Sequence, residues 1–196
     1  MLSAVACAIA PAQITLAFAP APPLAAAVTR AAVAEAAAIW QPYGVAVTGA
    51  DLIACPARTD GLVLTVVMSS ATAPPADRQA PLGAVDFDAD GAPAHVMTVF
   101  VDRILRMLEG AHLWSVPASQ WPRVIREQAV GCAIGRVIAH EIGHVLLRSR
   151  RHTARGLMRA VQPAGRADRS GPHPVSATAL IASARSQRRG RRRSPG

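Results

Sequence analysis

The chain has 196 residues and a formal net charge of +9 at pH 7, a length that fits one domain with a hydrophobic core. Its charge is uneven: residues 1–147 hold 8 Arg against 11 Asp and Glu, whereas residues 148–196 hold 13 Arg against one Asp. The basic excess therefore belongs to the C-terminal part and not to the body of the domain. No run reaches the roughly 20 apolar residues of a membrane span, so no such span is expected.

The N-terminal segment, residues 1–12, is apolar and rich in alanine but carries no basic residue. It fits a signal-like leader, and equally a structured lead into the first strand. The leader interpretation favours a secreted or periplasmic location over a cytoplasmic one. Every basic residue is arginine, which together with abundant alanine and proline suggests a bacterial genome rich in G and C.

The first half of the chain predicts strands around one helix. Apolar alternation indicates a strand at 13–18, and the alanine-rich residues 24–40 have the apolar spacing of a helix. Further strands are expected at 45–48, 61–68, 82–87 and 95–102, followed by a short helix at 103–111. The continuous apolar run of the strand at 61–68 predicts burial on both of its faces.

A long helix is expected from Pro122 to about Ser149, and its apolar residues on nearly all faces place it in the centre of the fold. Residues 175–186 fit a C-terminal helix. The prediction is thus one α+β domain over residues 13–186, followed by an Arg-rich tail at 187–196. The tail could bind nucleic acid or an anionic surface, but no aromatic residue accompanies it, so we favour a disordered, solvated terminus.

The long helix carries the motif His140-Glu141-Ile142-Gly143-His144. Residues four apart lie one turn above each other, so His140 and His144 can direct their imidazoles at one metal ion. Glu141 lies beside them on the same turn, where it can reach a water bound to that metal. A catalytic zinc ion takes three protein ligands and keeps its fourth position for water.

The third ligand has few candidates. After Glu141 the only acidic residue is Asp168, so no glutamate follows the motif, and the remaining downstream histidines are His152 and His173. His173 lies in a proline-rich loop that the helix cannot position. His152 follows His144 by eight residues, which allows the helix to end and the chain to turn back. We therefore expect His152 to be the third ligand.

This segment resembles the metzincin zinc peptidases, whose pattern is H-E-x-x-H-x-x-G-x-x-H followed by a Met-turn. Gly156-Leu157-Met158 is similar to a shortened Met-turn. The chain departs from the pattern in two places. Leu147 replaces the helix-ending glycine, and Arg150 occupies the position of the third histidine, with His152 two residues later.

The resemblance implies a zincin fold, with a mixed, twisted sheet of about five strands and an active-site helix. It implies one catalytic Zn²⁺ on His140, His144 and His152, Met158 in the Met-turn, and Glu141 as general base. It also makes the strand at 82–87 the antiparallel edge that binds an extended peptide or protein substrate. We expect a monomeric metalloendopeptidase.

Two other interpretations accompany this one. The motif H-E-x-x-H also occurs by chance in helices, and a catalytically inactive pseudo-zincin or an Arg-tailed binding protein would carry the same residues. The three cysteines allow one disulfide, Cys55 with Cys132, if the protein is exported. Because Cys132 falls within the long helix, a buried free thiol is the favoured interpretation.

Overall fold

The structure is a computed structural model that describes residues 12–19, 24–50, 61–70, 80–113 and 115–159. The expected leader, the helix at 175–186, the Arg-rich tail, His173 and Cys55 lie outside these ranges. The described residues form an α+β fold with one mixed five-stranded sheet and three α-helices. This confirms the α+β class and the mixed sheet of five strands.

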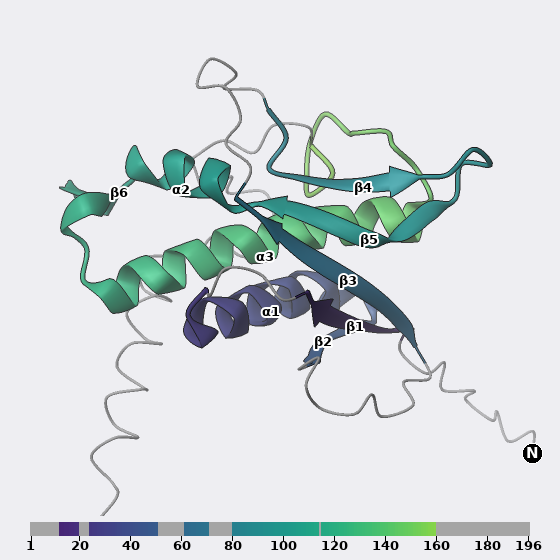
Figure 1. Cartoon of the computed structure of the whole chain (residues 1–196), viewed down its shortest axis with the longest axis horizontal. Helices are drawn as coiled ribbons and strands as arrows, with labels where there is room; N and C mark the ends of the chain where they lie inside the picture. The colour runs from purple at the N-terminus through teal and green to yellow at the C-terminus, as the bar shows by residue number, and fades with distance from the viewer. Residues whose placement is uncertain (1–11, 20–23, 51–60, 71–79, 114, 160–196) are drawn as a thin grey trace, which may run out of the picture.

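The sheet has the strand order β2-β1-β3-β5-β4 (Figure 1). Neighbouring strands run parallel except for β4, which pairs antiparallel with β5 at one edge. The strands are β1 (Ala12–Phe18), β2 (Val45–Ala50), β3 (Leu62–Ser69), β4 (Gly83–Phe87) and β5 (Pro93–Phe100). The prediction that the strand at 82–87 forms an antiparallel edge is therefore confirmed.

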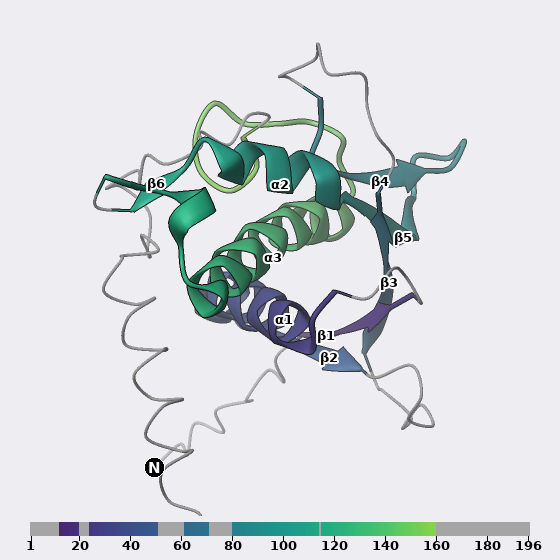
Figure 2. The ribbon, with the colours of Figure 1, turned by 60° about the vertical axis from the view of Figure 1, so that its left-hand side comes forward.

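Two helices pack side by side on one face of the sheet (Figure 2). They are α1 (Ala26–Trp40) and α3 (Arg123–Leu147), and Ala31 and Ala32 of α1 lie against Gly131 and Gly135 of α3. The Trp40 indole N–H also donates to Ala139 O at 3.0 Å. The small residues let the two helices approach closely, which fixes α3 over the sheet.

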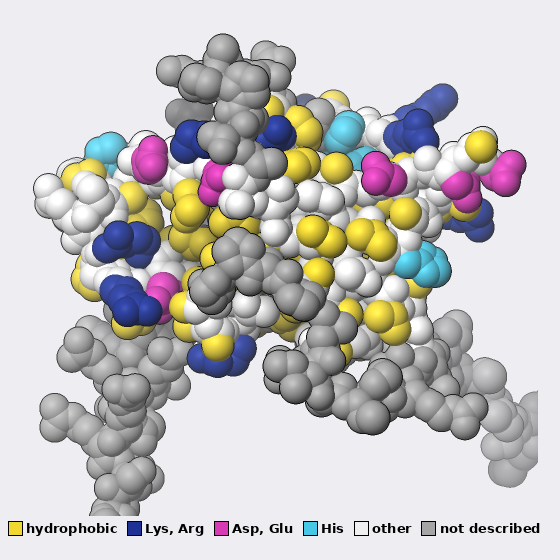
Figure 3. All heavy atoms as spheres, viewed as in Figure 1, with side chains coloured by type: hydrophobic (Ala, Val, Ile, Leu, Met, Phe, Trp, Pro, Cys, Tyr) yellow, Lys and Arg dark blue, Asp and Glu magenta, His cyan; other side chains and the backbone are white. Residues whose placement is uncertain are grey.

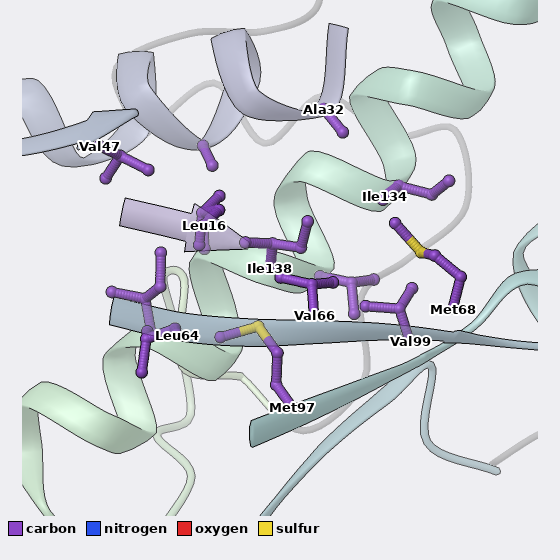
Figure 4. Close-up of a cluster of buried hydrophobic side chains, with 14 of the residues drawn as sticks. Leu16, Ala32, Val47, Leu64, Val66, Met68, Met97, Val99, Ile134 and Ile138 are labelled. Carbon is purple, nitrogen blue, oxygen red and sulfur yellow. The ribbon is translucent and has the colours of Figure 1, made fainter. Parts of the chain in front are cut away.

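The core lies between these helices and the sheet (Figure 4). Ile134 and Ile138 of α3 have no exposed surface and pack with Leu16 of β1 and Val66 of β3. Removing this much apolar surface from water is the main stabilising contribution to such a fold. It also holds the end of α3 that carries His140 and His144 in place.

The expectation that β3 is buried on both faces is wrong. Leu64, Val66 and Met68 are buried, but their neighbours along the strand are only half-buried and Val63 is 41% exposed. Both helices lie on the same face of the sheet, so the opposite face of β3 receives no helix among the described residues. A continuous apolar run does not distinguish one covered face from two.

The segment between β5 and α3 is more ordered than the expected short helix and irregular loop. It contains α2 (Val101–Glu109), the short hairpin of β6 (His112–Leu113) and β7 (Val116–Pro117), and the 3-10 turn Ala118–Gln120. Strand β5 ends at Phe100, two residues before the expected boundary, because Val101 and Asp102 already belong to α2.

Helix α3 begins at Arg123, with Pro122 as the residue that precedes its first turn. In length and composition α3 could cross a membrane, but most of the apolar stretch is buried inside this fold. A central core helix of a soluble domain has the same composition. The prediction of a buried central helix ending near Ser149 is confirmed, with its last residue at Leu147.

Candidate metal centre

The C-terminal half of α3 brings His140, Glu141 and His144 to one place beside β4. Both histidines are held by backbone carbonyl groups: His140 Nδ1 lies 2.7 Å from Leu157 O, and His144 Nδ1 lies 2.6 Å from Ser149 O. A carbonyl oxygen can only accept a hydrogen bond, so each Nδ1 carries the hydrogen. This leaves Nε2 of both rings without a hydrogen, as a metal ligand requires.

The two Nε2 atoms face each other at 3.1 Å. With both hydrogens on Nδ1 neither Nε2 can donate, so two lone pairs meet at the distance of a hydrogen bond. A cation between them removes this repulsion. In a tetrahedral zinc site with bonds of about 2.0–2.1 Å, two ligand nitrogens lie about 3.3 Å apart. The observed separation is close to that value.

His152 joins the pair from the segment after the helix. The three imidazoles offer ligand atoms that all lie within 4.8 Å of one another. The His152 ring centroid is 4.9 Å from that of His144 and 5.2 Å from that of His140. These three residues can therefore hold one metal ion, and the sequence predicted all three.

Burial lowers the pKa of both His140 and His152, and the neighbouring histidines lower the two values further. The hydrogen bond to Leu157 opposes this effect at His140. Metal ions bind the neutral imidazole, so a lowered pKa reduces competition from protons. The electrostatics of the site thus favour the ligand form of these rings near neutral pH.

The chain turns back toward the metal centre immediately after α3. Arg148 adopts the left-handed conformation with φ of 46°, and the Ser149 N–H donates to His144 O at 3.2 Å. The resemblance places this helix-ending turn at Leu147, one residue earlier. The later turn is one physical reason why the third histidine comes at His152 and not at Arg150.

A turn at Gly156–Arg159 lies against the histidine-bearing part of α3. Gly156 has φ of 79°, and the Arg159 N–H donates to Gly156 O at 3.3 Å. The turn buries Met158, whose exposed fraction is 9%, and presents Leu157 O to His140. A turn with a buried methionine therefore lies next to His140 at the residues where a Met-turn was expected.

Met158 fits there because residue 143 has no side chain. A Cβ built on Gly143 would overlap the Met158 sulfur and lie 3.2 Å from Met158 Cε. Gly143 stands between the two ligand histidines in the sequence. A glycine inside an apolar helix signals a close approach by another part of the chain, and here the methionine makes that approach.

We expect Gly143→Ala to displace Met158 and the Leu157 carbonyl that orients His140. Overpacking should lower the free energy of unfolding by about 1–3 kcal/mol and weaken metal binding. Gly110→Ala is the control, because its Cβ would meet only Met107 O, at 4.0 Å. Urea unfolding and metal titration of both variants test this. Equal metal affinity for Gly143→Ala and the wild type would contradict the role assigned to Gly143.

Glu141 is 4% exposed and lies against the edge strand β4. Burial raises the pKa of its carboxyl to about 7, and a hydrogen bond from the Val85 N–H opposes the rise. Gly83 allows this packing, because a Cβ there would lie 2.5 Å from Val137 Cγ1 and 2.8 Å from Glu141 Oε1. Strand β4 therefore sets the position of the glutamate.

Cys132 is a free, buried thiol in the described structure, as the favoured interpretation of the sequence expects. Burial is the main reason why its pKa is raised to about 11, and Glu35 raises it as well. A thiol with such a pKa remains protonated near neutral pH and is a poor nucleophile. Cys132 is not one of the residues whose ligand atoms gather at the metal centre.

Comparisons with protein-family models, with curated proteins and with solved structures found no match to this chain. The case for a metal centre therefore rests on the histidines themselves and on the groups that orient them. Sequence reasoning did not find Gly83, Val85 or the carbonyl groups of Ser149 and Leu157. Gly143 alone carried a signal, as a glycine within a buried helix.

Proposed function

We propose that the chain is a zinc-dependent metalloendopeptidase with a zincin-type fold. The observation that carries the proposal is the convergence of His140, His144 and His152, with Glu141 next to them on α3. The sheet supports it, since an antiparallel edge strand borders the site. The resemblance to metzincins in the H-E-x-x-H segment and the turn at Met158 supports it as well.

Zinc is the metal that this donor set fits best. Three neutral imidazoles with no carboxylate or thiolate suit zinc, and they leave a fourth position for water. Calcium and magnesium prefer oxygen ligands, which the three histidines do not offer. A zinc ion held there would lower the pKa of its water to about 7 and polarise the carbonyl group of a substrate.

Glu141 is the residue that moves the proton. Its carboxyl is buried beside His140 and is oriented by the Val85 N–H, so its position is fixed before a substrate arrives. A pKa near the working pH lets one group accept a proton from the attacking water and return it to the leaving amine. The pKa of about 7 in the metal-free protein is in the range where both steps occur.

Strand β4 would bind the substrate backbone. The Phe100 N–H donates to Leu82 O at 2.9 Å, so alternation directs the backbone groups of Gly83 and Val85 away from β5. No strand of the described chain pairs with that outer side. An extended peptide can add there as a further strand by pairing with the remaining outward backbone groups, because the Val85 N–H already donates to Glu141.

Removal of the metal tests the proposal. Purified, zinc-loaded protein is expected to hydrolyse an unfolded protein such as casein, to lose that activity in a chelator, and to regain it when zinc is added. Magnesium added instead of zinc should not restore activity, which controls for a contaminating magnesium enzyme. Stoichiometric zinc without any hydrolysis would support the inactive pseudo-zincin instead.

A further inference from the structure

The loop after α3, residues 148–159, is rich in positive charge. It carries five arginines and no acidic residue, and all five side chains are exposed. They are Arg148, Arg150, Arg151, Arg155 and Arg159. Figure 3 shows arginine and histidine side chains, with acidic side chains among them, along the edge where this loop passes β4. None of the five forms an ion pair with a described acidic residue.

This loop is fixed to the site at several points. Ser149 O and Leu157 O accept the Nδ1 hydrogens of the two helix histidines, His152 joins them, and Met158 is buried below. The loop that carries the arginines is therefore held against the three histidines. Fixed charges of one sign beside a cleft attract a ligand of the opposite sign and raise its local concentration.

Arg150 has the most defined position of the five. Its Nη2 donates to Phe87 O at 3.2 Å, and its guanidinium carbon lies 4.9 Å from the centroid of the Phe87 ring. Both contacts place it at the last residue of β4. A guanidinium has five N–H donors in a planar fork, and Phe87 O accepts from one nitrogen only. The remaining donors have no acceptor among the described residues and can bind a carboxylate.

Resting on the proposed function, we propose that Arg150 makes the enzyme select acidic peptides. A substrate strand that extends along β4 passes from Glu141, beside Val85, to Arg150, beside Phe87. An Asp or Glu side chain, or a terminal carboxylate, at that end accepts a bidentate hydrogen bond from the guanidinium. Because Arg150 already donates to Phe87 O, a substrate strand cannot use that carbonyl group, and its pairing with β4 ends there.

Matched peptides test this directly. Fluorogenic peptides are made in matched pairs, one pair for each position that flanks the cleaved bond. The two members of a pair differ only in having Glu or Gln at that position, and their kcat/KM values with the zinc-loaded protein are compared. We expect a preference for the acidic peptide of about tenfold or more, the range of a charge-assisted hydrogen bond, that weakens as salt is added. Arg150→Gln should reduce the preference to about one.

Arg151→Gln is the matched control, since it removes the same charge one residue away and its side chain has no described contact. Arg151→Gln should keep most of the preference for the acidic peptide. A ratio of the two kcat/KM values near one in the wild type, or an equal loss of preference in the two variants, would overturn the assignment to Arg150. Cleavage of the neutral peptide with no acidic preference would leave the proposed function intact.

If neither peptide is cleaved, the proposed function fails, and binding still decides the inference. Zinc-loaded Glu141→Gln protein is titrated with both labelled peptides and with a single-stranded oligonucleotide, with fluorescence anisotropy as the readout. Tighter binding of the acidic peptide that depends on Arg150 supports the inference. Tighter binding of the oligonucleotide, with the same dependence, overturns it in favour of a phosphodiester ligand.

Discussion

Glu141→Gln is expected to lower kcat/KM for peptide hydrolysis by about 10²–10⁴-fold while the protein keeps its zinc. General acid–base catalysis contributes about that much, and glutamine has the size of glutamate but cannot take up the proton. The Val85 N–H can still donate to the amide oxygen, so the site should keep its shape. The measurement is hydrolysis of a fluorogenic peptide together with zinc content by mass spectrometry.

Glu127→Gln is the control for this variant. Glu127 lies on the same helix and pairs with the exposed Arg123 at 2.7 Å, away from the three histidines. The control should retain wild-type hydrolysis and zinc. Full activity in Glu141→Gln would contradict the role of Glu141 as general base. Loss of zinc in that variant would instead give Glu141 a structural part in the metal site.

The same substitution should stabilise the metal-free protein at high pH. Burial raises the pKa of Glu141 from 4.5 to about 7, so the folded chain holds a proton that the unfolded chain releases in this interval. The free energy of unfolding therefore falls as the pH rises from about 5 to above 7. Glutamine removes this penalty, so Glu141→Gln should be more stable by about 3 kcal/mol at pH 8.

Urea unfolding in a chelator at pH 5 and pH 8 measures this effect. The difference between the two proteins should fall to below about 1 kcal/mol at pH 5, because that pH lies well below the folded pKa and only slightly above the unfolded pKa of 4.5. With zinc bound, the difference at pH 8 should shrink, because a nearby cation favours the ionised carboxylate. A pH-independent difference would mean that packing, and not ionisation, separates the two proteins.

The sequence predicted the elements that depend on local patterns. The strands at β1, β2, β4 and β5 and the helices α1 and α3 followed from apolar periodicity, and the three histidines followed from helical spacing and elimination. The antiparallel edge at β4 came from the resemblance alone. Periodicity could not have ordered the strands, because it carries no information about which strands pair.

The groups that orient the site could not be predicted, because they are backbone atoms from distant segments. Leu157 O reaches His140 across 17 residues, and the Val85 N–H reaches Glu141 from another element. Arg150 entered the sequence analysis only as a departure from the metzincin pattern. Its contact with Phe87 spans 63 residues and depends on the path of the loop after α3. The half-buried face of β3 was missed because its burial depends on which side of the sheet the described helices pack.

Zinc content is the measurement that tests the account most directly. Purified wild-type protein, His152→Ala and His173→Ala are each loaded with zinc, dialysed and analysed for bound metal. We expect one zinc ion per chain in the wild type and in His173→Ala, and little or none in His152→Ala after dialysis, because two of three ligands remain. A wild type without zinc, or a His152→Ala variant that retains it as well as the wild type does, would contradict the three-histidine centre.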